Sequence, residues 1–324
     1  MKWNQRRLGL AAQVLFWLFA FATLCAALAP LSWTFELFSH FRAQYFFVGL
    51  LIALDLWLVR HRLLSLAALA LTAWHAVVVV PALLAPAEAA PAEPRRALRV
   101  LSINVFGHND QYQRVLRYLR SERPDVLIVI EVTPPWGEAL QGLRGEYAYS
   151  WVMPTGVRAG LAMFSRERPL GTRVVDLGNT GEPSMVLTVQ TPDGPVAVLG
   201  THLYWPLGPD HSRTRNTQLA GIVRVARETR EPLLVAGDLN ITPFSPRFAA
   251  TLRDGALRSC ADDRLVPTWP ARMPFLFIQI DHCLVSSALA VRDFRSGPYL
   301  GSDHYPIVMD VGIEAPRAAA QPGT

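Results

Sequence analysis

Several short apolar segments of this chain end or begin at a side chain that could take part in catalysis. An isolated carboxylate, amide or imidazole at a strand end is usually a turn or cap residue. A set of them predicts a shared site, because strand ends at one edge of a sheet lie close together in space. The residues are Asn104, Glu131, His202, Asp238, Asn240, Asp281, Asp303 and His304.

The chemical types of these residues indicate metal-assisted attack of water on a phosphoester. Carboxylate and amide oxygens are hard ligands that suit Mg²⁺ or Mn²⁺. The sequence contains no HExxH segment and no cysteine cluster with zinc spacing. It also lacks a Gly-x-Ser-x-Gly elbow, which disfavours an acyl hydrolase. Histidines without an evident nucleophile beside them suit the stabilisation of charge on a phosphate.

Strand and helix patterns alternate between residues 98 and 313. Segments 111–122 and 214–229 have apolar residues at helical spacing. Segment 185–203 predicts a hairpin that turns at Asp193-Gly194. Strands outnumber helices, so we expect an α/β fold of the β-rich sandwich type rather than a doubly wound sheet. The other predicted strands are 98–104, 125–131, 160–166, 232–240, 277–286 and 306–313.

Three long apolar segments occupy the first 85 residues, namely 9–29, 43–59 and 63–85. The first carries no charge, and at about 1.5 Å per residue it spans a hydrocarbon core. A cleaved signal peptide is the alternative, because Ala27-Leu28-Ala29 resembles a cleavage site. Two further apolar segments follow, so we interpret all three as transmembrane helices that anchor the chain in the bilayer.

Basic residues predict the orientation of these helices. One cluster precedes the first segment and another separates the second from the third, and both favour the cytoplasmic side. Three crossings then place the following domain outside the cytoplasm. A further basic group at 95–99 argues mildly for the reverse, but it lies beyond the segments, where the rule weakens. The two clusters are Lys2, Arg6 and Arg7, and Arg60 and Arg62.

A Pro/Ala-rich linker is expected at 86–97 between the anchor and a domain at 98–313, and a disordered tail at 314–324. The domain has 22 arginines and 21 acidic residues. A balance of +1 is weak support for tight non-specific DNA binding, which needs many phosphate contacts. Cys260 and Cys283 could form a disulfide outside the cytoplasm, although a small buried thiol is the commoner fate. The sequence leaves that alternative open.

The segments that carry these residues resemble the endonuclease/exonuclease/phosphatase superfamily in order and spacing. They are LSINV, DVLIVIEV, GLAMFSR, LGTHL, VAGDLNITPFS, IDHCLVS and GSDHYPIVMDV. The resemblance covers residues 98–313, and GDLN, IDH and SDHYP together are far more specific than any one alone. It implies a four-layer α-β-β-α sandwich, like that of DNase I, with the site at one edge of the paired sheets. It also implies hydrolysis of phosphoesters with Mg²⁺ or Mn²⁺.

The resemblance assigns roles to the matching residues. Glu131 is expected to be the principal metal ligand, with Asn104 and Asp303 completing or flanking the metal site. Asp238 is expected to orient or deprotonate the attacking water. Asn240 is expected to hold that water or a phosphate oxygen.

The histidines follow from the same resemblance. His304 is expected to contact the scissile phosphate, and Asp281 to keep its imidazole oriented and cationic. His202 is expected to support the phosphate or the leaving oxygen. His282 should point to the opposite face of its strand and be structural.

Candidate substrate contacts lie after the predicted hairpin. Tyr204 and Trp205 would suit the rim of a site, and Arg215 could meet a phosphate or be a solvated residue at a helix start. Superfamily members act on DNA, RNA, inositol phosphates and sphingomyelin, and loops choose among these. Nucleic acid and a lipid or small phosphoester therefore have equal support, and the sequence leaves the protein partners unknown.

A catalytically inactive membrane protein that uses the fold for binding is the alternative from another class. Loss of catalysis should erase at least one site residue, and the predicted site is complete. We therefore expect a membrane-anchored, metal-dependent phosphoesterase.

Overall fold

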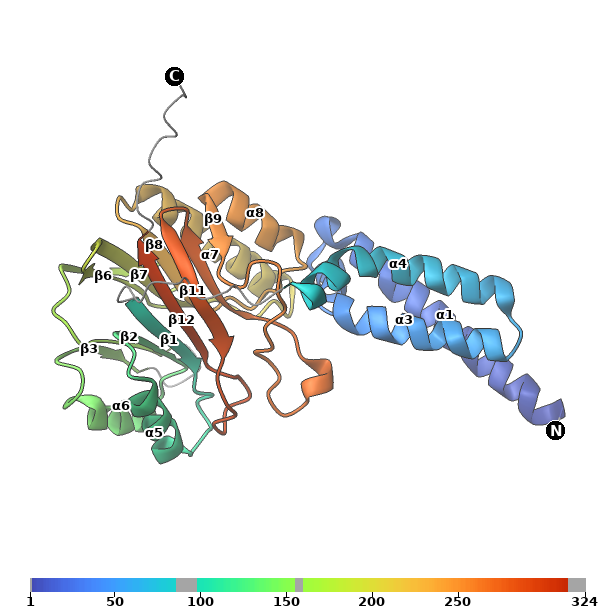
Figure 1. Ribbon diagram of the computed structural model, residues 1–324, viewed down its shortest axis with the longest axis horizontal. Coiled ribbons are helices and arrows are strands. Elements are labelled where there is room, and N and C mark those ends of the chain that lie inside the picture. The colour runs from blue at the N-terminus through green and yellow to red at the C-terminus, as the bar shows by residue number, and fades with distance from the viewer. Residues whose placement is uncertain (1, 86–97, 155–159, 314–324) are drawn as a thin grey trace, which may run out of the picture.

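The computed structural model describes residues 2–85, 98–154 and 160–313. They form an elongated helical bundle and a domain of packed sheets, and the bundle joins one end of the domain (Figure 1). The chain starts at the far end of the bundle (Figure 1). The predicted linker and the predicted tail lie outside the described residues.

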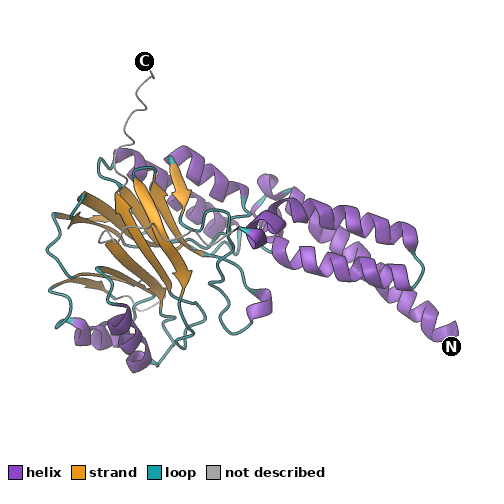
Figure 2. Cartoon of the chain, viewed as in Figure 1, coloured by secondary structure: helices purple, strands orange, loops and turns teal. Residues whose placement is uncertain are grey.

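The described part of the domain contains two six-stranded sheets (Figure 2). The first has the order β11-β12-β1-β2-β4-β3, and the second has the order β5-β6-β7-β8-β10-β9. In each sheet one central pair is parallel, β1 with β2 and β7 with β8. The strands are β1 (Leu98–Asn104), β2 (Val126–Ile130), β3 (Tyr149–Met153), β4 (Leu161–Ser165), β5 (Gly171–Val175), β6 (Ser184–Thr191), β7 (Gly194–His202), β8 (Leu233–Asp238), β9 (Leu257–Ser259), β10 (Asp281–Ser286), β11 (Leu289–Ser296) and β12 (Ile307–Ile313).

Helices cover the outer face of each sheet. Helices α5 (Tyr112–Glu122) and α6 (Pro134–Leu140) pack on the first sheet, and α7 (Pro209–Glu228) and α8 (Pro246–Gly255) pack on the second. Strand β2 is buried throughout, because alternate residues face the second sheet or the helices. The result is the α-β-β-α sandwich that the sequence predicts.

The strand register brings the predicted residues to one edge of the sandwich. Strands β1 and β2 run parallel, so Asn104 lies opposite Ile130 and next to Glu131. Strands β7 and β8 also run parallel and place His202 opposite Asp238. Strand β10 runs antiparallel to β8 and starts at this edge, with Asp281 opposite Asp238.

Two sequence predictions differ from the structure in detail. The segment predicted as a strand from residue 277 becomes β10 only at Asp281, because a 3-10 turn at Pro274–Leu276 precedes it. Ile278 pairs there with Trp269 in an isolated bridge. Strands β3, β5, β9 and β11 and helices α6 and α8 have no clear sequence signal. Strand β5, for example, is an edge strand with mostly exposed residues, so burial leaves no periodic pattern in it.

The bundle contains α1 (Lys2–Ala27), a 3-10 turn (Ala29–Leu31), α2 (Trp33–Ser39), α3 (Arg42–Leu58) and α4 (Arg62–Leu84). Two helices are long and apolar enough to cross a membrane, α1 from Gly9 and α4. A third span exists if α2 and α3, which meet at a bend of 65°, are counted as one. Gly49 allows the helices to pack closely, because a Cβ there would lie 2.2 Å from the Thr72 hydroxyl.

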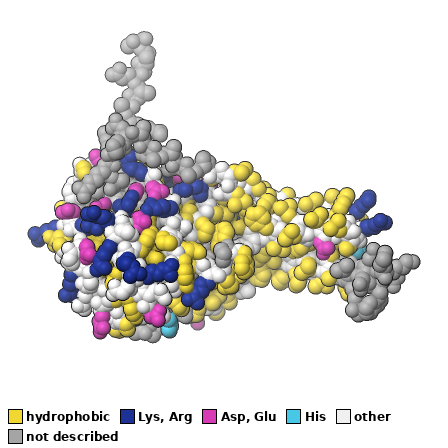
Figure 3. Space-filling view, turned by 60° about the horizontal axis from the view of Figure 1, so that its bottom comes forward, with side chains coloured by type: hydrophobic (Ala, Val, Ile, Leu, Met, Phe, Trp, Pro, Cys, Tyr) yellow, Lys and Arg dark blue, Asp and Glu magenta, His cyan; other side chains and the backbone are white. Residues whose placement is uncertain are grey.

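The outer surface of the bundle is apolar (Figure 3). Large side chains such as Trp17, Leu51, Leu63 and Val77 are more than half exposed. Lys and Arg side chains appear at the end of the bundle that is far from the domain (Figure 3). An apolar belt of this kind is unfavourable in water and favourable in a lipid core.

Cys260 and Cys283 form a disulfide, so the commoner alternative of two free thiols does not apply. Cys283 lies in β10 and Cys260 directly follows β9. The Cys260 N–H donates to the Cys283 carbonyl at 2.8 Å, and the Cα atoms are 5.3 Å apart. Strand pairing, which the spacing of the cysteines does not reveal, brings the sulfurs together.

Candidate active site

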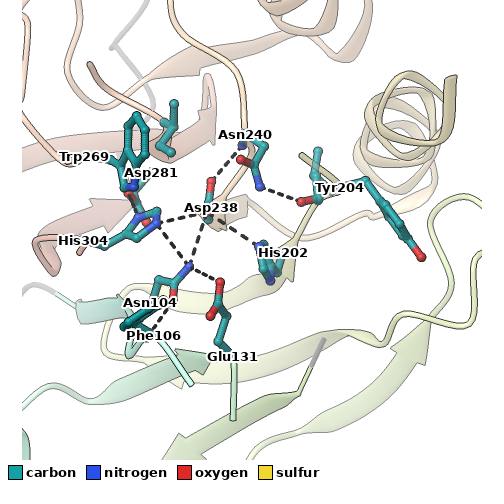
Figure 4. Close-up of polar contacts among 12 residues, drawn as sticks. Asn104, Phe106, Glu131, His202, Tyr204, Asp238, Asn240, Trp269, Asp281 and His304 are labelled. Atoms are coloured by element: carbon teal, nitrogen blue, oxygen red, sulfur yellow. Dashed lines mark hydrogen bonds and ion pairs between the residues drawn. The ribbon is translucent and has the colours of Figure 1, made fainter. Parts of the chain in front are cut away.

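Asp238 lies at the centre of the polar cluster at the sandwich edge (Figure 4). It is 2 % exposed and ends β8. Its Oδ2 is 3.7 Å from Nε2 of His202 and 3.7 Å from Nε2 of His304. Its Oδ1 accepts the Asn240 N–H at 2.9 Å. Neighbours from the same sheet and from the loop before β12 therefore surround one buried carboxylate.

The tight backbone of the GDLN segment explains the position of Asp238 and Asn240. Gly237 has φ +147°, and a Cβ there would lie 1.8 Å from the Thr201 carbonyl oxygen, so only glycine fits. Asn240 has φ +49°, a left-handed conformation that asparagine tolerates. Its side-chain Nδ2 donates to the Leu203 carbonyl at 2.8 Å. These contacts hold Asn240 beside Asp238.

Asn104 connects the two sheets at the site. Its Nδ2 donates to Oε1 of Glu131 at 3.1 Å and lies 3.4 Å from both Asp238 Oδ2 and His304 Nε2. Its Oδ1 accepts the Phe106 N–H at 2.9 Å, which assigns the amide orientation. In this orientation the amide NH₂ of Asn104 faces the site and donates to Glu131, while the amide oxygen accepts the Phe106 N–H.

Glu131 directly follows β2 and has φ +61°, a strained backbone conformation for a non-glycine residue. Its Oε2 accepts the Gly107 N–H at 3.2 Å. No ion pair among the described residues includes Glu131. Among the described residues, its carboxylate is therefore held by the neutral donors Asn104 and Gly107.

His304 is held as a cation between two carboxylates. Its Nδ1 is 2.8 Å from Asp281 Oδ2, and its backbone N–H donates to Ser302 Oγ at 3.0 Å. Burial disfavours the charged imidazole, but the carboxylates of Asp281 and Asp238 outweigh burial and raise the pKa of His304. Its Nε2–H can therefore donate toward Asp238 or toward an anionic ligand.

Asp238 has a raised pKa because burial disfavours its ionised form. Asp281 raises this pKa further, while His304 and His202 oppose the shift. A carboxylate with a raised pKa is a better proton acceptor at neutral pH than an ordinary aspartate. The arrangement can thus take a proton from a water molecule.

Asp303 lies apart from the hydrogen-bonded cluster. Its Oδ2 accepts the Trp269 indole N–H at 3.1 Å. Its Oδ1 is buried and has no hydrogen-bond partner, which is costly for a carboxylate oxygen unless a cation or a donor occupies the site.

The side chains of the predicted substrate-binding residues are not part of the polar cluster around Asp238. The Tyr204 ring points away from it (Figure 4) and lies 5.5 Å from the His211 ring. Trp205 is 43 % exposed and stacks on His211. Arg215 is fully buried and donates to Glu36 at 2.6 Å, so it cannot reach a substrate from this position. The predicted phosphate contact of Arg215 is therefore wrong.

The site also uses residues that the sequence did not single out. Ser302 Oγ donates to the Asn104 carbonyl at 2.7 Å and so joins the His304 loop to β1. Thr268 Oγ1 accepts the backbone N–H groups of Ile280 and Asp281. Their signal is weak because serine and threonine are common in loops. His282 faces away and contacts the Ile241 carbonyl at 2.8 Å.

The donor set is compatible with a divalent cation. Four carboxylates lie at this edge, and the cations beside them among the described residues are imidazoles. Asp238, Asp281 and His304 offer ligand atoms within 4.8 Å of one another. Asp281 already binds His304 at 2.8 Å, and the same imidazole lies 3.7 Å from Asp238. Among the described residues, Glu131 has no ion pair and the Asp303 Oδ1 atom has no hydrogen-bond partner.

The sequence profile of the Endonuclease/Exonuclease/phosphatase family matches residues 101–304, and the chain belongs to this family. Family members are phosphoester hydrolases that depend on divalent metals. No curated protein matches the chain.

Solved structures show the same fold. A humanized D. rerio TDP2 is 16 % identical with a TM-score of 0.56, and the match covers 67 % of this chain and 99 % of that one. An endonuclease/exonuclease/phosphatase from Beutenbergia cavernae is 24 % identical with a TM-score of 0.55, over 68 % and 72 %. The human Nocturnin catalytic domain with bound sulfate is 18 % identical with a TM-score of 0.56, over 68 % and 96 %.

We predict that removal of the Asp281 charge shifts the pH dependence of hydrolysis. Asp281→Asn removes a charge that raises the pKa of both Asp238 and His304, so both pKa values fall. The pH interval in which Asp238 is ionised and His304 is protonated moves to lower pH. The pH profile of kcat/KM, measured for both proteins, should show both limbs displaced toward acid. Asp193→Asn, at the exposed hairpin turn, should leave the profile unchanged, and so would Asp281→Asn if these assignments are mistaken.

Proposed function

We propose that this protein is a membrane-anchored phosphoesterase that uses Mg²⁺ (or Mn²⁺) and water, with its catalytic domain outside the cytoplasm. The observation that carries the catalytic part is the convergence of Glu131, Asp238 and His304 through the Asn104 amide. These residues come from separate strand ends of both sheets, and their contacts match the chemistry that the family performs.

The protein's own residues divide the work between proton transfer and charge stabilisation. Asp238 accepts the proton of the attacking water, and Asn240 helps to orient that water. His304, kept cationic by Asp281, donates to a phosphoryl oxygen as negative charge builds up. His202, 3.7 Å from Asp238 on the other side, supports the phosphate or the leaving oxygen.

Glu131 and Asp303 would hold the divalent cation, and Asn104 would orient Glu131. A bound cation supplies charge neutralisation for the phosphate and its leaving oxygen. The half-buried position of Glu131 at the mouth of the cluster suits a group that must meet both the cation and the substrate.

The metal assignment is tested with the full chain in detergent. Glu131→Ala should lower kcat by about 10²-fold or more on whichever substrate the parent hydrolyses. The panel contains plasmid DNA, RNA, sphingomyelin vesicles and bis-p-nitrophenyl phosphate, each with and without a chelator. Glu138→Ala, at an exposed position of α6, is the matched control. Equal activity of Glu131→Ala and the parent on every substrate would remove the catalytic assignment.

The arrangement of the anchor supports the proposal that the catalytic domain lies outside the cytoplasm. Arg60 and Arg62 lie at the turn between α3 and α4. This turn is at the end of the bundle opposite the domain (Figure 1). The residues between α1 and α3 lie at the domain end, as three crossings require. The Cys260–Cys283 disulfide also suits an oxidising compartment.

The orientation predicts the outcome of reporter fusions. A reporter that is active only outside the cytoplasm, fused after Ile313, should be active in intact cells. The same reporter inserted at Arg60 should be silent, because that turn is expected in the cytoplasm. The reverse pattern would place the catalytic domain in the cytoplasm.

A lipid-surface phosphoester is the substrate class that the exposed side chains favour. The loop between Trp269 and Ile278 starts beside Asp303 and exposes Met273, Phe275 and Leu276. Its Phe277 carbonyl accepts the Gln44 amide of α3 at 2.7 Å, so the loop lies beside the anchor. Apolar side chains at this position can enter the bilayer interface.

A second apolar loop begins on the other side of the cluster. Asn240 contacts the Leu203 carbonyl, and Trp205 and Leu207 that follow are 43 % and 55 % exposed. A nucleic-acid groove would instead be basic, and the domain's charge balance of +1 does not supply a general excess. D. rerio TDP2 has been crystallised with a single-strand DNA product, so DNA is the competing substrate.

Substitution of the exposed Phe275 distinguishes a lipid-surface substrate from DNA. Phe275→Ser should lower hydrolysis of a phosphoester in vesicles by about 10-fold, since an apolar anchor leaves the interface. Hydrolysis of soluble bis-p-nitrophenyl phosphate should not change. Leu170→Ser, 61 % exposed before the edge strand β5, should affect neither. Efficient cleavage of DNA with no effect of Phe275→Ser would favour the nuclease alternative.

A further inference from the structure

Glu36 is a buried acid of the anchor that contacts the catalytic domain. It lies in α2 and is 2 % exposed. Its Oε2 accepts a hydrogen bond from Arg215 of α7 at 2.6 Å, and its Oε1 accepts one from Ser245 at 2.5 Å. Arg247 approaches the same carboxylate at 3.8 Å. Most of the binding capacity of this carboxylate is therefore used by the catalytic domain.

Arg215 needs this acid. Its side chain is fully buried, and a guanidinium stays charged in a protein. A buried charge is strongly unfavourable without an opposite charge beside it. Among the described residues, Glu36 is the acid that pairs with Arg215. The counter-charge of Arg215, a residue of the catalytic domain, is thus supplied by Glu36 of the membrane anchor.

The pair continues into the active site. A second nitrogen of Arg215 donates to the Asn240 carbonyl at 3.3 Å. Asn240 is the left-handed residue whose N–H contacts Asp238, so a donor to its carbonyl stabilises that peptide orientation. The segment from Asn240 to Ser245 is then held at further points, since His40 lies 2.9 Å from the Thr242 hydroxyl and Glu36 binds Ser245, which caps α8.

The anchor residues in these contacts precede the part of the chain that the family profile matches, residues 101–304. We propose that Glu36 is a positioning residue for catalysis, which fixes the segment 240–245 through Arg215 and Ser245. The active site is then complete only when the domain is docked on its own anchor. This inference rests on the proposed function for its kinetic effects but not for the docking itself.

The docking also fixes the direction of the site. Arg215 and Ser245 lie near the starts of α7 and α8, at the same edge as Asp238 and Asn240. Pairing of these helix starts with α2 turns the catalytic edge toward the bundle and so toward the bilayer. A rigid contact at this edge places the substrate rim at a constant height above the membrane.

The test compares three variants of the full chain in detergent with the parent. Glu36→Gln keeps the shape of the side chain but leaves Arg215 without a counter-charge. Glu36→Gln with Arg215→Met removes both charges, which is often neutral for stability although loss of one partner is not. Asp55→Asn, an exposed acid in α3 of the same anchor, is the matched control. The measurements are kcat and KM on bis-p-nitrophenyl phosphate, thermal stability, and amide hydrogen exchange of residues 240–248.

We expect Glu36→Gln to lower kcat by about 10-fold with little change in KM, and to speed hydrogen exchange in residues 240–248. The double variant should regain thermal stability but not kcat, because Arg215→Met removes the donor to the Asn240 carbonyl. Asp55→Asn should match the parent throughout. Should Glu36→Gln fail to fold, the double variant carries the test alone.

Two results would overturn the proposal. One is exchange in residues 240–248 that stays at the parent rate in both Glu36 variants. The other is recovery of kcat together with stability in the double variant, which would make the pair a structural contact only. If the parent hydrolyses no substrate of the panel, the proposed function fails, and the hydrogen exchange alone decides whether the anchor holds the segment.

Discussion

Asp238 and Asp281 face each other across the β8–β10 pair, and the burial of both carboxylates constrains everything around them. Burial raises the pKa of Asp238, and repulsion from the charge of Asp281 raises it further. His304 offsets the repulsion by binding Asp281 directly and facing Asp238. The same contacts keep His304 cationic, so one electrostatic constraint yields a proton acceptor and a charged donor side by side.

The geometry of the site depends on the packing of two sheets. Asp238, Asp281 and His202 belong to the second sheet, whereas Asn104 ends β1 of the first sheet and Glu131 directly follows β2. Asn104 spans the boundary with one amide, which lies within 3.4 Å of Glu131, Asp238 and His304. Close packing of the apolar layer between the sheets therefore sets the separation of the catalytic groups.

The contact between anchor and domain follows the same electrostatic rule. A guanidinium that is wholly buried requires an acid, and Arg215 finds it in Glu36 of the helical bundle. Arg215 also donates to the Asn240 carbonyl, so the charge pair is connected directly to the segment of residues 240–245. The apolar bundle, whose helices are long enough to cross a membrane, is in this way connected to the segment that carries Asn240.

Local patterns in the sequence determined much of this protein. Apolar runs and their polar ends predicted the principal strands, the hairpin at Asp193-Gly194, the three apolar helices and the set of residues at the catalytic edge. These features can be predicted from the sequence because burial and turn geometry depend on only a few neighbouring residues. GDLN is the clearest case, since Gly237 and Asn240 have conformations that few other residues tolerate.

Only the tertiary structure decided which distant groups pair. It buried Arg215 against Glu36 rather than exposing it to a substrate, joined Cys260 to Cys283, and turned the oxygen of Asn104 toward the Phe106 N–H. It also revealed edge strands such as β5, whose exposed residues have no periodicity to detect. Charge pairing and amide orientation depend on partners that are up to about 200 residues away along the chain. Local spacing in the sequence therefore cannot predict these partners.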